Sequence, residues 1–374
     1  GLSRILRGHE KGVWAFALLP DNRTLVSGAS DGSVQLWDLR APTSAATVVI
    51  PDRAAAWRFI GDRELVMVSR NGRVSRRRGP QFEEVMPIMQ VYPAPDALYH
   101  APVFAHDSTL MAQGAPLSPK SPDAKIVIWD WARRTQVAEI STGQRQRLTA
   151  VKFTPQGKSI LAIADIRSTP APSLTEWDIA SGQEIGSWPL PKSAGVNTYT
   201  SSVGRRSFTF SWDARQAVIL DSEDKHTHLD LASRRQTPLG IDLKRTPALK
   251  GGAFSHDNRL FAAPSISGLL RVLDLTQPGF PEIAVRKESL HAFQGVHGVT
   301  FSPDDQRLVT GGGGATAIFF WDVNNFQPLL VLSGTGSAFW DPTFSPDGNT
   351  LGSTSGGGVS GALTLWHAPS WAEI

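Results

Sequence analysis

The sequence of 374 residues contains no cysteine, and methionine and tyrosine are rare, with 4 and 3 residues. Without cysteine the chain forms no disulfide, offers no thiol nucleophile and holds no Cys-ligated zinc or iron–sulfur cluster. The lack of disulfides favours a cytoplasmic protein. No apolar run approaches the ~18 residues of a membrane-spanning helix, and no secretory leader is visible. We therefore expect no membrane insertion.

Neither sign of charge dominates, because 37 Lys and Arg face 34 Asp and Glu and leave a net charge of +3. With 41% hydrophobic residues the chain can bury a large core, which excludes a disordered protein. Single cores stop growing near ~250–300 residues, so this length requires several domains or a repeated unit. Paired arginines, as at Arg133-Arg134 and Arg205-Arg206, indicate either a solvated surface or a patch for an anionic partner.

Patterns for phosphate binding and metal-dependent hydrolysis are missing as well. The glycine runs 311–314 and 356–358 precede no helical pattern, so we interpret them as loops. One possible ligand set lies on one face of a predicted strand and consists of Asp224, His226, His228 and Asp230. A local register shift or hydrogen-bonded histidines explains that set better. We predict no enzyme, no cofactor and no metal.

Internal repetition is the strongest pattern in the chain. Phe344-Ser345-Pro346-Asp347-Gly348 is echoed by residues 301–305. Six weaker copies begin at Leu18, Phe59, Phe104, Phe153, Phe210 and Phe254, which we call anchors together with Phe301 and Phe344. Successive anchors are 41 to 57 residues apart, and each precedes an apolar strand that usually ends in Trp-Asp. Eight such copies predict a repeat architecture.

The residues between each anchor and the following Trp-Asp pair predict β-strands. Residues 24–28 and 33–37 are rich in β-forming residues and flank the turn pair Asp31-Gly32. No segment keeps a 3.6-residue apolar period, so we expect no long helix. The fold class is all-β.

These residues carry a resemblance to a known family. Gly8-His9, the Leu18 anchor, Ser27-Gly28, Asp31-Gly32 and Trp37-Asp38 resemble one complete WD40 repeat. The resemblance implies one domain over residues 1–374, an eight-bladed propeller of four-stranded antiparallel blades. Its expected repeats are 4–40, 45–86, 98–140, 142–188, 197–239, 244–285, 291–332 and 335–374. Seven blades is the alternative, in which 45–86 is the misread copy.

Ring closure follows from the same resemblance. Residues 4–6 are expected to close the ring as the outer strand of the last blade, in preference to the tail 366–374. The tail also resembles the ends of bacterial WD40 domains found in multidomain signalling proteins with Ser/Thr kinase modules. We expect a monomeric propeller fused to another domain.

Two departures from the family pattern affect the expected blades. The family's buried hydrogen-bonded tetrad maps completely onto the first copy alone, as His9, Ser27, Asp31 and Trp37, where its role is structural. In the second copy Arg76-Arg77-Arg78 replaces Leu-Trp-Asp, which indicates a register slip or an exposed basic strip. An arginine at a buried position is costly unless it is paired.

The resemblance places partner-binding residues four and six positions before each anchor. The sixteen positions contain no acidic residue. Our predicted partner-binding residues on this top face are Trp14, Arg53, His100, Arg147, Arg206, Lys250, His297 and Trp340. Basic and aromatic side chains suit an acidic or phosphorylated peptide. The chain is thus predicted to be an interaction scaffold; a ligand-sensing or catalytic channel and nucleic-acid binding through the arginines are the alternatives.

Overall fold

In the computed structural model the described residues contain β-strands and no helix. They are residues 13–20, 24–30, 34–38, 46–52, 54–91, 102–106, 108–115, 125–142, 148–154, 156–164, 173–190, 208–220, 226–239, 252–264, 269–286, 296–312, 318–332, 338–356 and 362–368. No helix within these ranges is long and apolar enough to cross a membrane.

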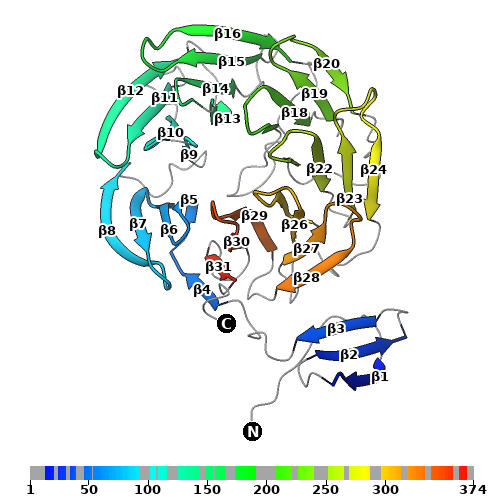
Figure 1. Cartoon of the computed structure of the whole chain (residues 1–374). Helices are drawn as coiled ribbons and strands as arrows, with labels where there is room; N and C mark the ends of the chain where they lie inside the picture. Colours follow the sequence, from blue (N-terminus) through cyan, green and yellow to red (C-terminus); the bar gives the residue numbers. More distant parts are fainter. Residues whose placement is uncertain are drawn as a thin grey trace.

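Seven four-stranded antiparallel sheets form a closed ring of blades (Figure 1). Six blades consist of four consecutive strands that run from the channel to the rim. They are β5(Ala54–Gly61), β6(Glu64–Ser69), β7(Arg73–Arg78) and β8(Glu83–Gln90); β9(Val103–Phe104), β10(Leu110–Ala115), β11(Lys125–Asp130) and β12(Thr135–Ser141); β13(Leu148–Phe153), β14(Ser159–Ala164), β15(Ser173–Asp178) and β16(Glu184–Pro189); β17(Phe208–Phe210), β18(Gln216–Leu220), β19(His226–Asp230) and β20(Gln236–Pro238); β21(Ala253–Phe254), β22(Leu260–Pro264), β23(Leu270–Asp274) and β24(Glu282–Arg286); and β25(Gly298–Phe301), β26(Arg307–Gly311), β27(Ile318–Asp322) and β28(Pro328–Leu332).

The seventh blade closes the ring with a strand from the other end of the chain. It contains β29(Ala338–Phe344), β30(Thr350–Gly356), β31(Leu363–His367) and, at the rim, β4(Ala46–Ile50). β4 pairs antiparallel with β31, with Val48 opposite Leu365. Closure from the N-terminal side is thus confirmed, but the expected strand 4–6 was the wrong one, because β4 occupies the outer edge of β31.

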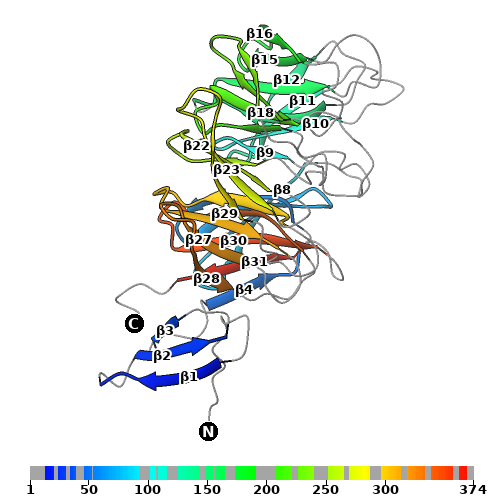
Figure 2. The same ribbon diagram turned by 90° about the vertical axis from the view of Figure 1, so that its right-hand side faces the viewer.

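The expectation of eight blades was wrong, and the stated alternative of seven is confirmed. The copy that lies outside the ring is the first, not residues 45–86. Its strands β1(Val13–Leu18), β2(Thr24–Ala29) and β3(Val34–Asp38) form a separate three-stranded sheet, which both views place beside the ring (Figures 1 and 2). Residues 45–86 instead supply β4 and most of the blade β5–β8, in which β6 pairs with β7 without a shift while β-bulges interrupt the pairing of β5 with β6 and of β7 with β8.

The core consists of apolar wedges between neighbouring blades. The anchors Phe254 and Phe301 are 2% and 1% exposed and fill two of these wedges. Each such burial stabilises the fold by roughly 1.5–3 kcal/mol. At the closing seam Ile50 and Leu363 pack against Leu65 of β6. Each blade is therefore stabilised mainly by the two blades beside it.

Candidate functional site

The ring has two faces at which side chains can meet a partner. The top face is the end at which the innermost strands begin; the bottom face is the end at which they turn into the second strands. Many of the loops at the top face, including residues 116–124 and 165–172, lie outside the described residues. The turns of the bottom face are described in nearly every blade.

At the top face the structure brings together two of the predicted partner-binding residues. His297 precedes β25 and Trp340 lies on β29, and their ring centroids are 4.5 Å apart. The backbone N–H of His297 donates to the carbonyl of Gly311 at 2.7 Å, which fixes the start of the strand. His297 is buried and Trp340 is partly exposed, so Trp340 is the member of the pair that can meet a partner.

In several sheets a β-bulge interrupts the strand pairing at or next to the residue four positions before the anchor. The pairing of innermost and second strands skips Trp14 in β1, Ala55 in β5 and Thr149 in β13. In β29 the irregularity follows Trp340, where Asp341 has a left-handed φ of 49°. Such β-bulges turn side chains out of the sheet pattern and are frequent near functional sites. The backbone therefore singles out the same positions that the sequence did.

The remaining predicted residues are not tested by these contacts. Arg53, His100, Arg147, Arg206 and Lys250 lie outside the described residues, as does the side chain of Trp14. They stay predictions.

The tetrad of the first copy also stays a prediction. His9 and Asp31 lie outside the described residues, as does the side chain of Trp37, whereas Ser27 is buried. A related contact occurs in the ring, where the Trp321 indole donates to the Thr310 hydroxyl at 3.0 Å and both are buried. This bond was not predicted from the sequence, although Trp321 stands at the same place before Asp322 as Trp37 does before Asp38.

The arginine run of the second copy forms no free basic strip. Arg76 and Arg78 both pair with Glu64 of the neighbouring strand. Arg77, whose side chain is 12% exposed, pairs with Asp52 and with Glu84. Burial raises the pKa of Glu64, but the two arginines outweigh it and hold that pKa below its usual value. The run pairs with β6 in an uninterrupted register, and the shift between Arg76 and Arg77 against β8 recurs at the equivalent place in other blades. The charge is neutralised within the blade, so this run offers little to a nucleic acid.

On the bottom face a repeated side-chain motif explains the repeated letters. In four blades a buried serine donates its hydroxyl to the aspartate two residues later and accepts the backbone N–H five residues later. The pairs are Ser211 with Asp213, Ser255 with Asp257, Ser302 with Asp304 and Ser345 with Asp347. In these four blades the turn after the innermost strand is therefore held by this pair of serine hydrogen bonds, which we call the serine lock.

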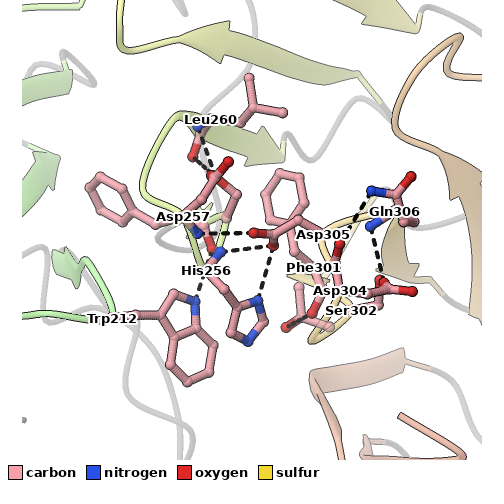
Figure 3. Close-up of polar contacts among 12 residues, drawn as sticks. Trp212, His256, Asp257, Leu260, Phe301, Ser302, Asp304, Asp305 and Gln306 are labelled. Carbon is pink, nitrogen blue, oxygen red and sulfur yellow. Dashed lines mark hydrogen bonds and ion pairs between the residues drawn. The ribbon is translucent and has the colours of Figure 1, made fainter.

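Three of these turns also bridge neighbouring blades through an aromatic cluster (Figure 3). The Trp212 indole stacks on the His256 imidazole at 4.1 Å and donates to the carbonyl of Phe254 at 3.2 Å. Asp305 of the next blade accepts the backbone N–H of His256 at 2.8 Å and that of Asp257 at 2.9 Å, and it lies 3.0 Å from His256 Nδ1. The His106 ring packs edge-on against the Trp212 indole, with the two ring centroids 5.8 Å apart. These contacts hold Trp212, which is 39% exposed, in one orientation.

Sequence comparison within the chain could have found Asp305. It occupies the place of Gly348 in the repeat, and both have left-handed φ angles, of 55° and 74°. A non-glycine residue is uncommon at such a position and Asp is one of the types that tolerate it, so the side chain is a candidate for a specific contact. Here that contact is the bridge to the next blade.

The two histidines of the possible metal site are packed inside a blade. His226 and His228 of β19 are both buried, and His228 Nε2 lies 2.8 Å from the Gln216 side chain. Burial lowers the pKa of His228, although the Asp230 carboxylate acts in the opposite direction. Asp224 lies outside the described residues. Within the described ranges no three His, Asp or Glu residues are grouped to hold a metal ion.

Comparison with known families agrees with this geometry. The sequence model of the WD domain, G-beta repeat, matches residues 1–38 and 286–322. The first segment contains β1–β3 and the second contains β25–β27. A search of curated proteins finds no match to the chain. The matched repeats and the ring of seven four-stranded blades together support a WD40 β-propeller, a fold that generally serves as a scaffold for protein interactions.

Proposed function

We propose that this propeller is a non-enzymatic interaction platform that binds an acidic or phosphorylated peptide segment at its top face. The observation that carries the proposal is the contact between His297 and Trp340 on adjacent blades. Both occupy the same place in the repeat, four residues before an anchor. A partly exposed tryptophan held by a neighbouring ring offers apolar contact area at low entropic cost.

We infer an anionic partner from the positive charge of the predicted partner-binding residues. Arg53, Arg147, Arg206 and Lys250 belong to the same predicted set, which contains no acidic residue. Arginine binds carboxylate and phosphate groups with paired hydrogen bonds. A basic channel mouth also speeds the encounter with an anionic segment.

The cellular setting is part of the same proposal. The link to a larger bacterial signalling protein of the Ser/Thr kinase-associated type rests on the resemblance of the tail. The cytoplasmic location rests on the absence of cysteine. A monomeric ring with a protein or peptide partner fits both.

A peptide library tests the proposal. The chain is presented with phosphoserine- and glutamate-rich peptides and with lysine-rich peptides of the same length. We expect the acidic peptides to bind, and the triple variant Arg206→Ala, Lys250→Ala, Trp340→Ala to lose at least ~10-fold in affinity. Trp212→Ala, on the bottom face, is the matched control and retains binding. Equal binding of lysine-rich peptides, or an unaffected triple variant, would contradict the proposal.

A further inference from the structure

The sheet β1–β3 has the sequence of a propeller blade but lacks the surroundings of one. The anchor Leu18 on β1 is 49% exposed, whereas the anchors Phe153 and Phe301 of the ring are 4% and 1% exposed. Val34, paired with Gly28 in β2, is 67% exposed, whereas Ile318 occupies the equivalent position opposite Gly311 and is 0% exposed. In the ring these positions are covered by neighbouring blades, so β1–β3 is a blade whose apolar positions are bare.

Both sides of β1 are uncovered. Phe16 is 76% exposed and Val13 is 52% exposed, and Ala15 and Ala17, which alternate with Phe16 and Leu18, are exposed as well. Successive residues of a strand point to opposite faces. An apolar strand that is bare on both faces fits a position between two other sheets. A single strand added at the edge of the sheet would leave these faces open.

The number of strands identifies which blade of a ring β1–β3 represents. Six blades of the ring take their fourth strand from the residues that directly follow the third. The exception is the last blade, in which β29–β31 receive β4 from the distant end of the ring's own sequence. Among the described residues β1–β3 likewise has three consecutive strands, and the next described strand, β4, belongs to the ring. Its form is therefore that of a last blade.

We propose that β1–β3 is the closing blade of a second WD40-type propeller. Its two neighbouring blades and its fourth strand are supplied by polypeptide N-terminal to residue 1. The direction follows from strand order, because in the ring of this chain the three-stranded blade comes after all the others. The chain then passes directly from the last blade of one ring, β1–β3, to the closing strand of the next, β4. On this proposal the single domain expected over residues 1–374 divides between β3 and β4.

Hydrogen exchange measured by mass spectrometry tests this inference, with residues 1–374 compared with the polypeptide extended through its preceding reading frame. In residues 1–374 alone, we expect the amides of β1–β3 to exchange at least ~100-fold faster than those of β25–β27. In the extended polypeptide they become protected to within ~10-fold of the ring. A matched pair of variants supports the assignment: Leu18→Asp leaves the Tm of the ring in residues 1–374 unchanged, whereas Phe301→Asp lowers or abolishes it.

Three results would overturn the proposal. If β1–β3 is protected in residues 1–374 at every concentration and Leu18→Asp lowers the Tm, the sheet packs on the ring itself. Protection that grows with protein concentration would show that a second copy covers the sheet. Sheet amides that stay unprotected in the extended polypeptide would show that no second ring forms.

Discussion

The blade β5–β8 and the sheet β1–β3 contain similar strands in entirely different surroundings. Val74 on β7 is fully buried between blades, and its equivalent on β3, Val34, is 67% exposed. Three strands of suitable residues thus form a sheet in either place, but burial depends on what lies on both faces. In this chain the formation of a blade-like sheet therefore depends on local sequence, whereas its place in the ring depends on contacts between residues far apart in the sequence.

The largest expected effect contrasts the two valines. Val74→Asp places an unpaired carboxylate between blades and should destabilise the ring by about 3–5 kcal/mol or prevent folding. Val34→Asp, at the same place in the repeat, should change the stability of the ring by less than ~0.5 kcal/mol. Urea denaturation followed by tryptophan fluorescence measures both. Equal losses would mean that β1–β3 is part of the ring.

The next effect concerns the charges that stabilise β5–β8. Arg77→Ala removes the cation between Asp52 and Glu84 and should cost about 1.5–3 kcal/mol, because charged hydrogen-bonding groups lose their partner. Arg78→Ala, whose side chain is 57% exposed, should cost less than ~1 kcal/mol. Thermal or urea unfolding compares the two variants. A larger loss for Arg78→Ala would contradict the paired arrangement.

A smaller effect is expected where Asp305 bridges two blades. Asp305→Ala removes the acceptor of the His256 and Asp257 N–H groups and keeps a side chain at a left-handed φ, so we expect a loss of about 1–3 kcal/mol. Asp305→Gly suits that backbone conformation and should lose less. The difference between the two variants in urea denaturation isolates the backbone contribution. If Asp305→Gly were as stable as the unchanged chain, the bridge would not explain why aspartate occupies this turn.

The smallest effect is a dependence of the stability of the ring on pH. Partial burial raises the pKa values of Asp304 and Asp347, but bonds from Ser302 and Ser345 and from nearby backbone N–H groups outweigh burial and hold both below the usual value. The unfolded chain therefore binds protons first as the pH falls. Stability contributed by these groups is present above about pH 4 and is lost at lower pH.

The double variant Asp304→Asn, Asp347→Asn should flatten the loss of stability between about pH 4 and pH 2. Glu184→Gln, on the exposed strand β16, is the control and should leave the slope unchanged. Urea midpoints at a series of pH values measure this slope. An unchanged slope in the double variant would contradict the role of the serine locks.

Much of the fold was predictable because it depends on local sequence. The alternation between turns and β-forming residues predicted the strands, and the recurring anchors predicted the blades. The number of blades was not predictable in this way. The first copy has the best local match, yet the destination of β4 depends on whether it pairs with β3 or with β31, more than 300 residues away.

The candidate site shows the same division. His297 and Trp340 follow from counting back from their anchors, because the repeat fixes where each innermost strand begins. The ion pairs of Arg77 were not predictable, since Asp52 lies in the connection between β4 and β5, Glu84 lies on β8, and these side chains meet only after folding. The bridge from Asp305 to His256 likewise joins turns 49 residues apart.

The central claim is that β4 closes a seven-bladed ring by pairing with β31. Because the chain contains no cysteine, an introduced pair reports this contact without background. Val48 and Leu365 are direct partners across the two strands, so oxidation of the variant Val48→Cys, Leu365→Cys should form an intramolecular disulfide in nearly all molecules. The account would be contradicted if this pair stayed reduced while Leu36→Cys, Val48→Cys cross-linked, since β4 would then be the fourth strand of β1–β3.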